Sequence, residues 1–158
     1  MAKQQPRFAR AKANAIRHYG LPFEFFRLML GDDCLYAEGY WSEGAATLVE
    51  AQRRRCDYIC RKLVLRPGDR LVEVGSGWGD MAMLAAETYG ADVVNYGLVP
   101  EQNRVMRRGL TGRVRIVERD HRDLILEPAA YDRYLSVGVY EHAAFASQRH
   151  GSKVSPPR

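Results

Sequence analysis

The spacing of apolar residues divides the chain into a helical first part and a mixed second part. Between residues 15 and 30 apolar side chains recur at helical spacing, with an interruption at residues 20–22. Residues 31–44 form a loop rich in glycine, aspartate and aromatic residues. Residues 47–63 predict a further helix, whose inward-facing residues are Leu48, Ala51, Cys56, Ile59, Cys60 and Leu63.

From residue 70 onward, short apolar runs alternate with helical segments. The predicted strands are residues 70–74, 92–96, 114–117 and 131–137, and the predicted helices are residues 81–89 and 101–108. Strands that alternate with helices are joined by right-handed crossovers and form a mostly parallel sheet. The pattern therefore predicts an α/β fold with a parallel sheet and flanking helices.

Positive charge is concentrated near the start of the chain. The formal net charge is +5, and residues 1–17 contain no acid. This charge fits solubility, contact with an anionic membrane surface or contact with nucleic acid. It does not distinguish among the three. The first segment contains the cations Lys3, Arg7, Arg10, Lys12 and Arg17.

The chain shows no apolar run of the length needed for a transmembrane helix and no signal peptide, so a cytoplasmic location is expected. Cys34, Cys56 and Cys60 lack a Cys-x-x-Cys spacing, so neither a metal site nor a disulfide is expected. The predicted organisation is a basic flexible arm (1–14), a helical cap (15–66), a ligand-binding α/β domain (67–147) and a disordered tail (148–158).

A glycine-rich turn at residues 75–80, Gly-Ser-Gly-Trp-Gly-Asp, joins a predicted strand to a predicted helix. Glycines at such a turn let a ligand approach the backbone closely. Asp80 stands at the start of the helix, where it would repel a pyrophosphate. Together with Glu73 it suits a ligand that bears an amine and a sulfonium. A turn of this kind without any ligand is the alternative.

Short matching segments occur in order between residues 16 and 142. They are His18-Tyr19, Phe25-Phe26-Arg27-Leu28-Met29-Leu30, Tyr40-Trp41, residues 47–52, 59–63 and 65–68, Glu101-Gln102, residues 120–124 and residues 136–142. Through these segments the chain resembles the cyclopropane fatty acid synthase and mycolic acid cyclopropane synthase family. The resemblance implies a Rossmann-like class I methyltransferase fold, with the family's later strands missing from this chain.

The same resemblance implies S-adenosylmethionine as the methyl donor. Gly75 and Gly77 are then expected to line its methionine part, and Tyr36 to close over it. Leu98 and Gln102 match positions that contact the ribose, and His121 matches an aromatic residue beside the adenine. The expected donor-binding residues are Tyr36, Glu73, Gly75, Ser76, Gly77, Leu98, Gln102 and His121.

The expected catalytic residues are His18, Glu38 and Glu141. In the family, a bicarbonate ion acts as general base, and the residues that match His18 and Glu141 help to bind it. Glu38 stands where the family has a cysteine beside this ion. A carboxylate there would either weaken anion binding or serve as the base itself.

The implied reaction is transfer of a methylene or methyl group to the double bond of unsaturated phospholipid acyl chains. The implied partners are a lipid acceptor and an anionic membrane, contacted peripherally at its inner face, whereas nucleic acid is not expected. Two alternatives remain open: a methyltransferase for a small soluble acceptor such as an amine, and a non-catalytic chain that binds only S-adenosylmethionine. The 158-residue chain alone is expected to be inactive. The acceptor, the product and the oligomeric state are not fixed by the sequence.

Overall fold

The computed structural model of the chain describes residues 5–32, 34–42, 44–75, 77–99, 112–126 and 130–139. In chain order its elements are α1 (Gln5–Tyr19), α2 (Phe23–Leu30), α3 (Leu48–Lys62), β1 (Arg70–Val74), α4 (Asp80–Tyr89), β2 (Asp92–Tyr96), β3 (Val114–Val117), the 3-10 helix η1 (His121–Leu126) and β4 (Arg133–Ser136). No helix within these ranges is long and apolar enough to cross a membrane.

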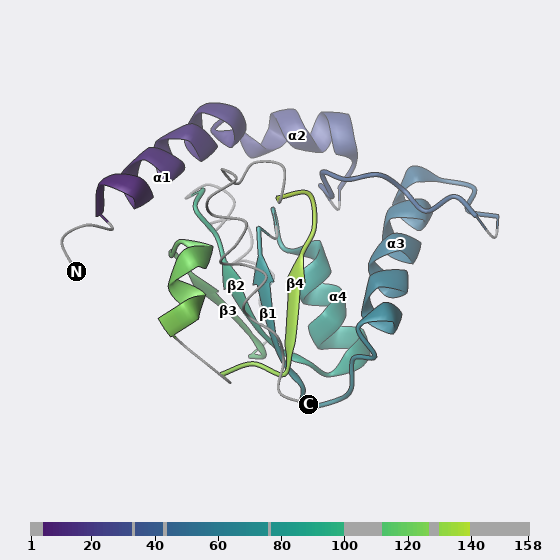
Figure 1. Ribbon diagram of the computed structural model, residues 1–158. Helices are drawn as coiled ribbons and strands as arrows, with labels where there is room; N and C mark the ends of the chain where they lie inside the picture. Colours follow the sequence, from purple (N-terminus) through teal and green to yellow (C-terminus); the bar gives the residue numbers. More distant parts are fainter. Residues whose placement is uncertain are drawn as a thin grey trace.

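The strands form a parallel sheet in the order β3-β2-β1-β4. The chain winds outward from β1 to β3 and returns to β4 on the other side of β1. This return places a topological switch point at the carboxyl ends of β1 and β4. Figure 1 shows α3 and α4 beside the sheet, with α1 and α2 above the end at which the strands finish. The predicted α/β fold with a helical cap is confirmed.

The helix α3 begins where a sequence signal places it. Thr47 precedes the helix, and its hydroxyl accepts a hydrogen bond from the Glu50 N–H at 3.2 Å. The Glu50 carboxylate in turn accepts one from the Ala46 N–H at 2.8 Å. This reciprocal capping satisfies backbone donors that the first helical turn leaves free, and so fixes the start of the helix.

Two details of the helical part differ from expectation. The arm expected over residues 1–14 is helical from Gln5 onward, because alanine alternates there with arginine and lysine, which are strong helix formers. Leu48, expected to face inward, is 39% exposed, and Gln52 is buried instead. The Gln52 amide N–H donates to the Leu35 carbonyl at 2.9 Å, which compensates its burial in part, since Oε1 has no partner among the described residues.

Among the strands, only the fourth differs from its predicted range. β4 occupies Arg133–Ser136, the middle of the expected 131–137. The helix expected at 101–108 and the tail expected at 148–158 lie outside the described residues.

The main core lies between the sheet and the pair α3–α4. Tyr89 of α4 donates its hydroxyl hydrogen to the Asp57 carboxylate of α3 at 2.5 Å, so a polar bond ties these two helices at the edge of the core. Burial and then this bond raise the pKa of Tyr89 to about 12. The buried core side chains are Cys56, Cys60, Leu65, Leu71, Met81, Ala82, Ala85, Ala86, Ala91, Val93, Val114 and Leu135.

The carboxyl end of α3 is closed by a Schellman-type turn. The Leu65 N–H donates to the Cys60 carbonyl at 3.2 Å, and the Val64 N–H donates to the Arg61 carbonyl at 3.0 Å. Val64 occupies the position at which such turns favour glycine, with a φ of 52°. A β-branched side chain is strained in this left-handed conformation.

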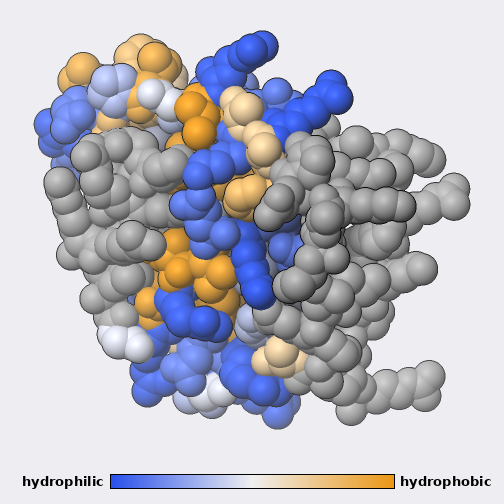
Figure 2. Space-filling model, turned by 90° about the vertical axis from the view of Figure 1, so that its left-hand side faces the viewer, coloured by the Kyte–Doolittle hydropathy of each residue, from blue (hydrophilic) through white to orange (hydrophobic). Residues whose placement is uncertain are grey.

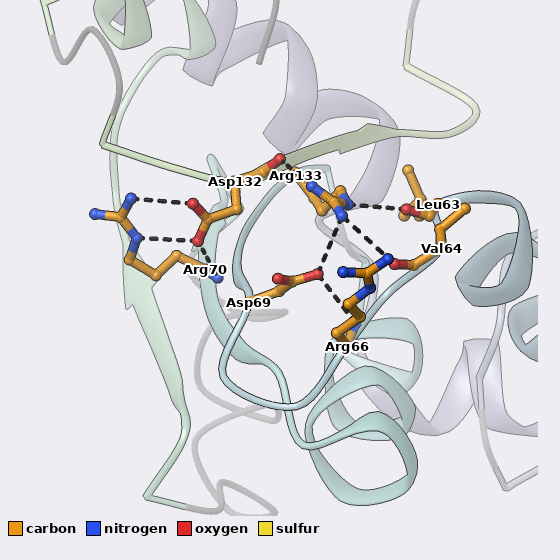
Figure 3. A network of polar contacts seen from close by, with 7 residues as sticks. All are labelled: Leu63, Val64, Arg66, Asp69, Arg70, Asp132 and Arg133. Carbon is orange, nitrogen blue, oxygen red and sulfur yellow. Dashed lines mark hydrogen bonds and ion pairs between the residues drawn. The ribbon is translucent and has the colours of Figure 1, made fainter. Parts of the chain in front are cut away.

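Arg133, at the start of β4, ties this turn to the sheet (Figure 3). Its guanidinium donates to the Leu63 carbonyl at 2.9 Å and lies 3.5 Å from the Asp69 carboxylate. Beside it, the Asp132 carboxylate accepts two hydrogen bonds from the Arg70 guanidinium, both at 3.1 Å. These bonds hold the pKa of Asp132 at about 2. The network joins the end of the helical cap to both β1 and β4.

We predict that Val64→Gly stabilises the fold by about 1 kcal/mol, because glycine adopts this φ without the strain of a side chain. The Val64 side chain is 59% exposed, so its removal costs little buried surface. Thermal unfolding should show a midpoint raised by roughly 4 °C. Val64→Ala is the matched control, because it removes similar surface but keeps a Cβ at positive φ. Equal midpoints for the two variants would show that strain at this position is negligible.

Candidate functional site

A cavity of about 1240 Å³ lies at the carboxyl ends of the strands. Its floor is formed by the last residues of β1 and β2 and by the residues that follow β4. α1 and the loop after α2 close it from above, in the region where Figure 1 places the cap over the sheet. The residues expected in the site that line this one cavity are His18, Tyr36, Glu38, Glu73, Gly75, Gly77, Leu98 and His121. Ser76, Gln102 and Glu141 lie outside the described residues.

The glycine-rich turn forms the middle of the cavity floor. Gly75 has a φ of 79°, and its N–H donates to the Tyr96 carbonyl at 3.1 Å. A Cβ on Gly75 would lie 2.2 Å from Cγ2 of Val139, so no larger residue fits. Gly77 has a φ of 58°, but a Cβ there would meet no atom within 4 Å. The first glycine is therefore needed for close packing, and the second borders open space into which a ligand fits.

Glu73 is the most unusual residue of the floor. Only 4% of its surface is exposed, and burial, supported by the charge of Asp80, raises its pKa to about 8, although a hydrogen bond with Asn95 lowers it in part. Its Oε2 atom is buried without a hydrogen-bond partner in the described part of the chain. A buried acceptor without a partner is costly, and a bound cation or donor would compensate it.

The far end of the cavity is formed by Leu98, after β2, and by His121 at the start of η1. Asp120 caps this short helix by accepting the Arg122 N–H at 3.0 Å and the Arg122 Nε at 2.7 Å. Burial raises the pKa of Asp120, but the bonds from Arg122 outweigh it, so the net pKa is lowered. Burial lowers the pKa of His121, with the opposing charge of Asp120 a smaller influence. His121 therefore presents a neutral imidazole to the cavity.

A cluster of aromatic rings holds the cap on the glycine-rich turn. Phe26 of α2 packs against Trp78 of the turn, with ring centroids 4.5 Å apart. Tyr36 makes edge contacts with Tyr19 of α1 at 5.9 Å and with Phe26 at 6.1 Å. Tyr36 therefore lines the cavity while it contacts both α1 and α2.

The polar side chains of the roof lie at the rim. His18 of α1 lines the cavity, and its ring contacts that of Tyr19 at 4.4 Å. The Glu38 side chain is 89% exposed and lies 3.5 Å from the Arg55 guanidinium of α3. The carboxylate is therefore directed to solvent and to Arg55, and this geometry does not favour Glu38 as a proton acceptor inside the cavity.

The polar cavity residues that the sequence did not indicate include Asn95 and Arg55, which contact the predicted site residues Glu73 and Glu38. Asn95 is fully buried in β2 and shares a hydrogen bond with Glu73. Its only signal is a polar residue between Val94 and Tyr96 in the strand. Arg55 reaches the cavity from α3. Its position next to the inward-facing Cys56 could have indicated this.

Sequence comparison finds relatives along nearly the whole chain. The family model for mycolic acid cyclopropane synthetase matches residues 7–151. A probable fatty acid methyltransferase from Pseudomonas putida is 40% identical over 144 residues, which are 87% of this chain and 36% of that protein. A cyclopropane-fatty-acyl-phospholipid synthase from Escherichia coli strain K12 is 36% identical over 126 residues, 79% of this chain and 32% of that protein. The chain thus spans about a third of the length of these two relatives.

Structural comparison agrees. The crystal structure of mycolic acid cyclopropane synthase CmaA1 complexed with SAH and CTAB matches with a TM-score of 0.74 and 32% sequence identity. The match covers 85% of this chain and 48% of that one. The family match runs from α1 through the glycine-rich turn and past β4. The chain belongs to the mycolic acid cyclopropane synthetase family.

Proposed function

We propose that the chain binds S-adenosylmethionine in the cavity and forms the donor-binding part of a methyltransferase for the double bonds of unsaturated phospholipid acyl chains. The observation that carries the proposal is the buried Oε2 atom of Glu73 beside the open space at Gly77. A cationic ligand that lies along the turn would satisfy that atom. Relatives named as a fatty acid methyltransferase and a cyclopropane-fatty-acyl-phospholipid synthase support the acceptor class.

The described residues fit the parts of this donor. Its ammonium and sulfonium charges suit the acidic pair Glu73 and Asp80, both of which line the cavity. The neutral ring of His121 suits a flat base, and Leu98 beside it offers an apolar contact for the sugar and base. When bound, S-adenosylmethionine supplies an electrophilic methyl group. Tyr36 and the rings around it would exclude water from that group.

Proton removal after methyl transfer needs a base, and we assign this role to Glu141 together with His18. Bicarbonate, implied as this base by the resemblance, fits the described side of the cavity poorly. Glu38 places a carboxylate where the family has a cysteine, and the nearby cation Arg55 is already paired with it, so a second anion would gain little there. The described residues therefore give no step that passes through bicarbonate.

A small soluble amine is the second candidate acceptor, and the carboxylate of Glu38 at the rim favours it. Methyl-labelled S-adenosylmethionine, incubated with the protein and either unsaturated phospholipid vesicles or soluble amines, separates the two. Label in the acyl chains supports the proposal, whereas label found only in the amines would identify an amine as the acceptor. Calorimetric binding of the donor is measured in parallel, because a protein that binds donor but labels neither acceptor would be a binding protein.

We predict that Gly77→Val abolishes donor binding, because its side chain would occupy the open space along the turn. Gly68→Val is the matched control: Gly68 has a φ of 84°, a Cβ there also meets nothing within 4 Å, and it lies outside the cavity. Both variants carry similar backbone strain, so calorimetry on folded protein isolates the effect of the cavity. Unchanged affinity of Gly77→Val for the donor would show that the turn is not part of the donor site.

The pH dependence of binding tests Glu73. With its pKa at about 8, the carboxyl is protonated at pH 7 in the empty cavity. A bound cation lowers that pKa, so binding releases a proton. Affinity should therefore rise between about pH 6 and about pH 8, by up to about tenfold per unit, and level off above. Glu73→Gln should remove this proton release, leaving only the titration of the ligand's amine. Calorimetry in buffers of different ionisation enthalpy measures it, and equal release from both proteins would contradict the assignment.

In a full-length enzyme that contains this chain, we predict that Glu141→Gln lowers turnover by about 10²–10⁴-fold while donor affinity stays within about twofold. The motivation is its place in the sequence shortly after β4, since ligands of such sheets gather beyond the carboxyl ends of the strands. Glu87→Gln is the control, since Glu87 is an exposed carboxylate on α4. Wild-type turnover in Glu141→Gln would show that Glu141 takes no part in catalysis.

A further inference from the structure

α2 presents apolar side chains on two sides. On the inner side Phe26 is buried against Trp78. On the other side a row of apolar residues faces solvent, and Leu28 within it is 86% exposed. Their spacing of four, three and one residues puts them on one face of the helix and its preceding turn. We call this face the α2 ridge; its members are Leu21, Phe25, Leu28 and Met29.

A short helix that is apolar nearly all round is expected to be covered on both sides. The only charged residues of α2 are Glu24 and Arg27, and Arg27 pairs with Asp32 at 3.1 Å. A contiguous exposed apolar face on a folded protein usually marks a contact surface. The ridge therefore indicates a contact surface. The charge around it indicates the kind of partner.

The ridge lies within the most basic part of the molecule. Residues 1–30 contain six lysines and arginines and one acid, a net charge of +5, which equals that of the whole chain. The remaining residues carry 18 cations and 18 acids and are neutral overall. Arg17, one turn before the ridge, is exposed. In Figure 2, apolar and hydrophilic atoms lie side by side at the top of the molecule, the height of α1 and α2 in Figure 1.

We propose that the α2 ridge inserts into the headgroup region of an anionic phospholipid bilayer, while Arg17 of α1 contacts the lipid phosphates. Apolar insertion and attraction to anionic lipid act together in interfacial helices. An apolar face flanked by cations, in a chain whose remaining charges cancel, is typical of helices that lie on anionic lipid, so the charge pattern favours a bilayer as the occupant. The inference rests on the proposed function only in naming the bilayer as the source of the acceptor.

The placement of the ridge also relates the bilayer to the cavity. The inner side of α2 packs on Trp78, which follows Gly77 in the glycine-rich turn. α1, which continues into α2, lines the cavity through Asn14 and His18. A bilayer that contacts the ridge would thus lie about one helix diameter, roughly 10 Å, from the turn.

Flotation with vesicles tests the proposal without donor or catalysis. The chain should float with phosphatidylglycerol vesicles and much less with phosphatidylcholine vesicles. Leu28→Glu should reduce binding to the anionic vesicles at least about tenfold, because it places a charge in the inserted face. Val64→Glu is the matched control, since Val64 is exposed at the far end of α3, and it should bind as wild type.

The contribution of charge is tested with a second pair of variants. Arg17→Gln should weaken binding to phosphatidylglycerol about fivefold, the loss of one cation near the surface. Lys62→Gln removes the same charge from the end of α3, where Lys62 lies over the Tyr58 ring, and should leave binding unchanged. Added salt should weaken wild-type binding.

Three outcomes would overturn the proposal. They are equal binding to both kinds of vesicle, unchanged binding of Leu28→Glu, and a concentration-dependent dimer that Leu28→Glu dissociates without an effect on vesicles. The last would show that a second copy covers the ridge. Calorimetry with S-adenosylmethionine on Leu28→Glu should match wild type, so failure of vesicle binding is distinguishable from failure of the donor site.

Discussion

Parallel pairing on both edges of β1 is the constraint from which the site follows. β1 lies between β2 and β4, and all of its residues after Arg70 are buried. Because these neighbours run in the same direction, their carboxyl ends meet at one edge of the sheet. The loops that follow them must share that edge, and Gly75 is the residue that allows two of them to come into contact, at Val139. A cavity at this place is thus a consequence of topology.

The site stores an unfavourable interaction at the same edge. Glu73 is buried in the central strand beside the cavity, where Asn95 is its hydrogen-bond partner and one carboxylate oxygen has no partner among the described residues. Such a group lowers the stability of the empty protein above its unfolded pKa, since the unfolded chain would release the proton that the folded chain retains up to about pH 8. A residue that served only the fold would be better replaced by an apolar one. Its presence is therefore best explained by a ligand that supplies the missing charge.

The local part of this arrangement could be predicted from the sequence, and the tertiary part could not. The strand, the glycine-rich turn and α4 are consecutive, so spacing alone gave their order and their ends. That His18 and Tyr36 lie over the same cavity as Glu73 came from family resemblance, because no local pattern relates residues so far apart. Arg55 was missed although its neighbour Cys56 faces inward. The early start of α1 was missed because charge was weighed above the helix propensity of alanine, lysine and arginine.

The attachment of the cap couples it to the donor site. α1 is joined to the sheet side by the ion pair of Lys12 with Glu118, whose side chains are partly exposed, and pairs of this kind contribute little. The stronger attachment is apolar: Phe26 is buried against Trp78, inside the glycine-rich turn. The position of the cap thus depends on the conformation of the same turn that would hold the donor. A ligand that fixes Gly77 would also fix Trp78 and, through it, α2. Binding at the floor of the cavity and the orientation of the apolar ridge outside it would then be linked through the contacts of Phe23 and Phe26 with Trp78.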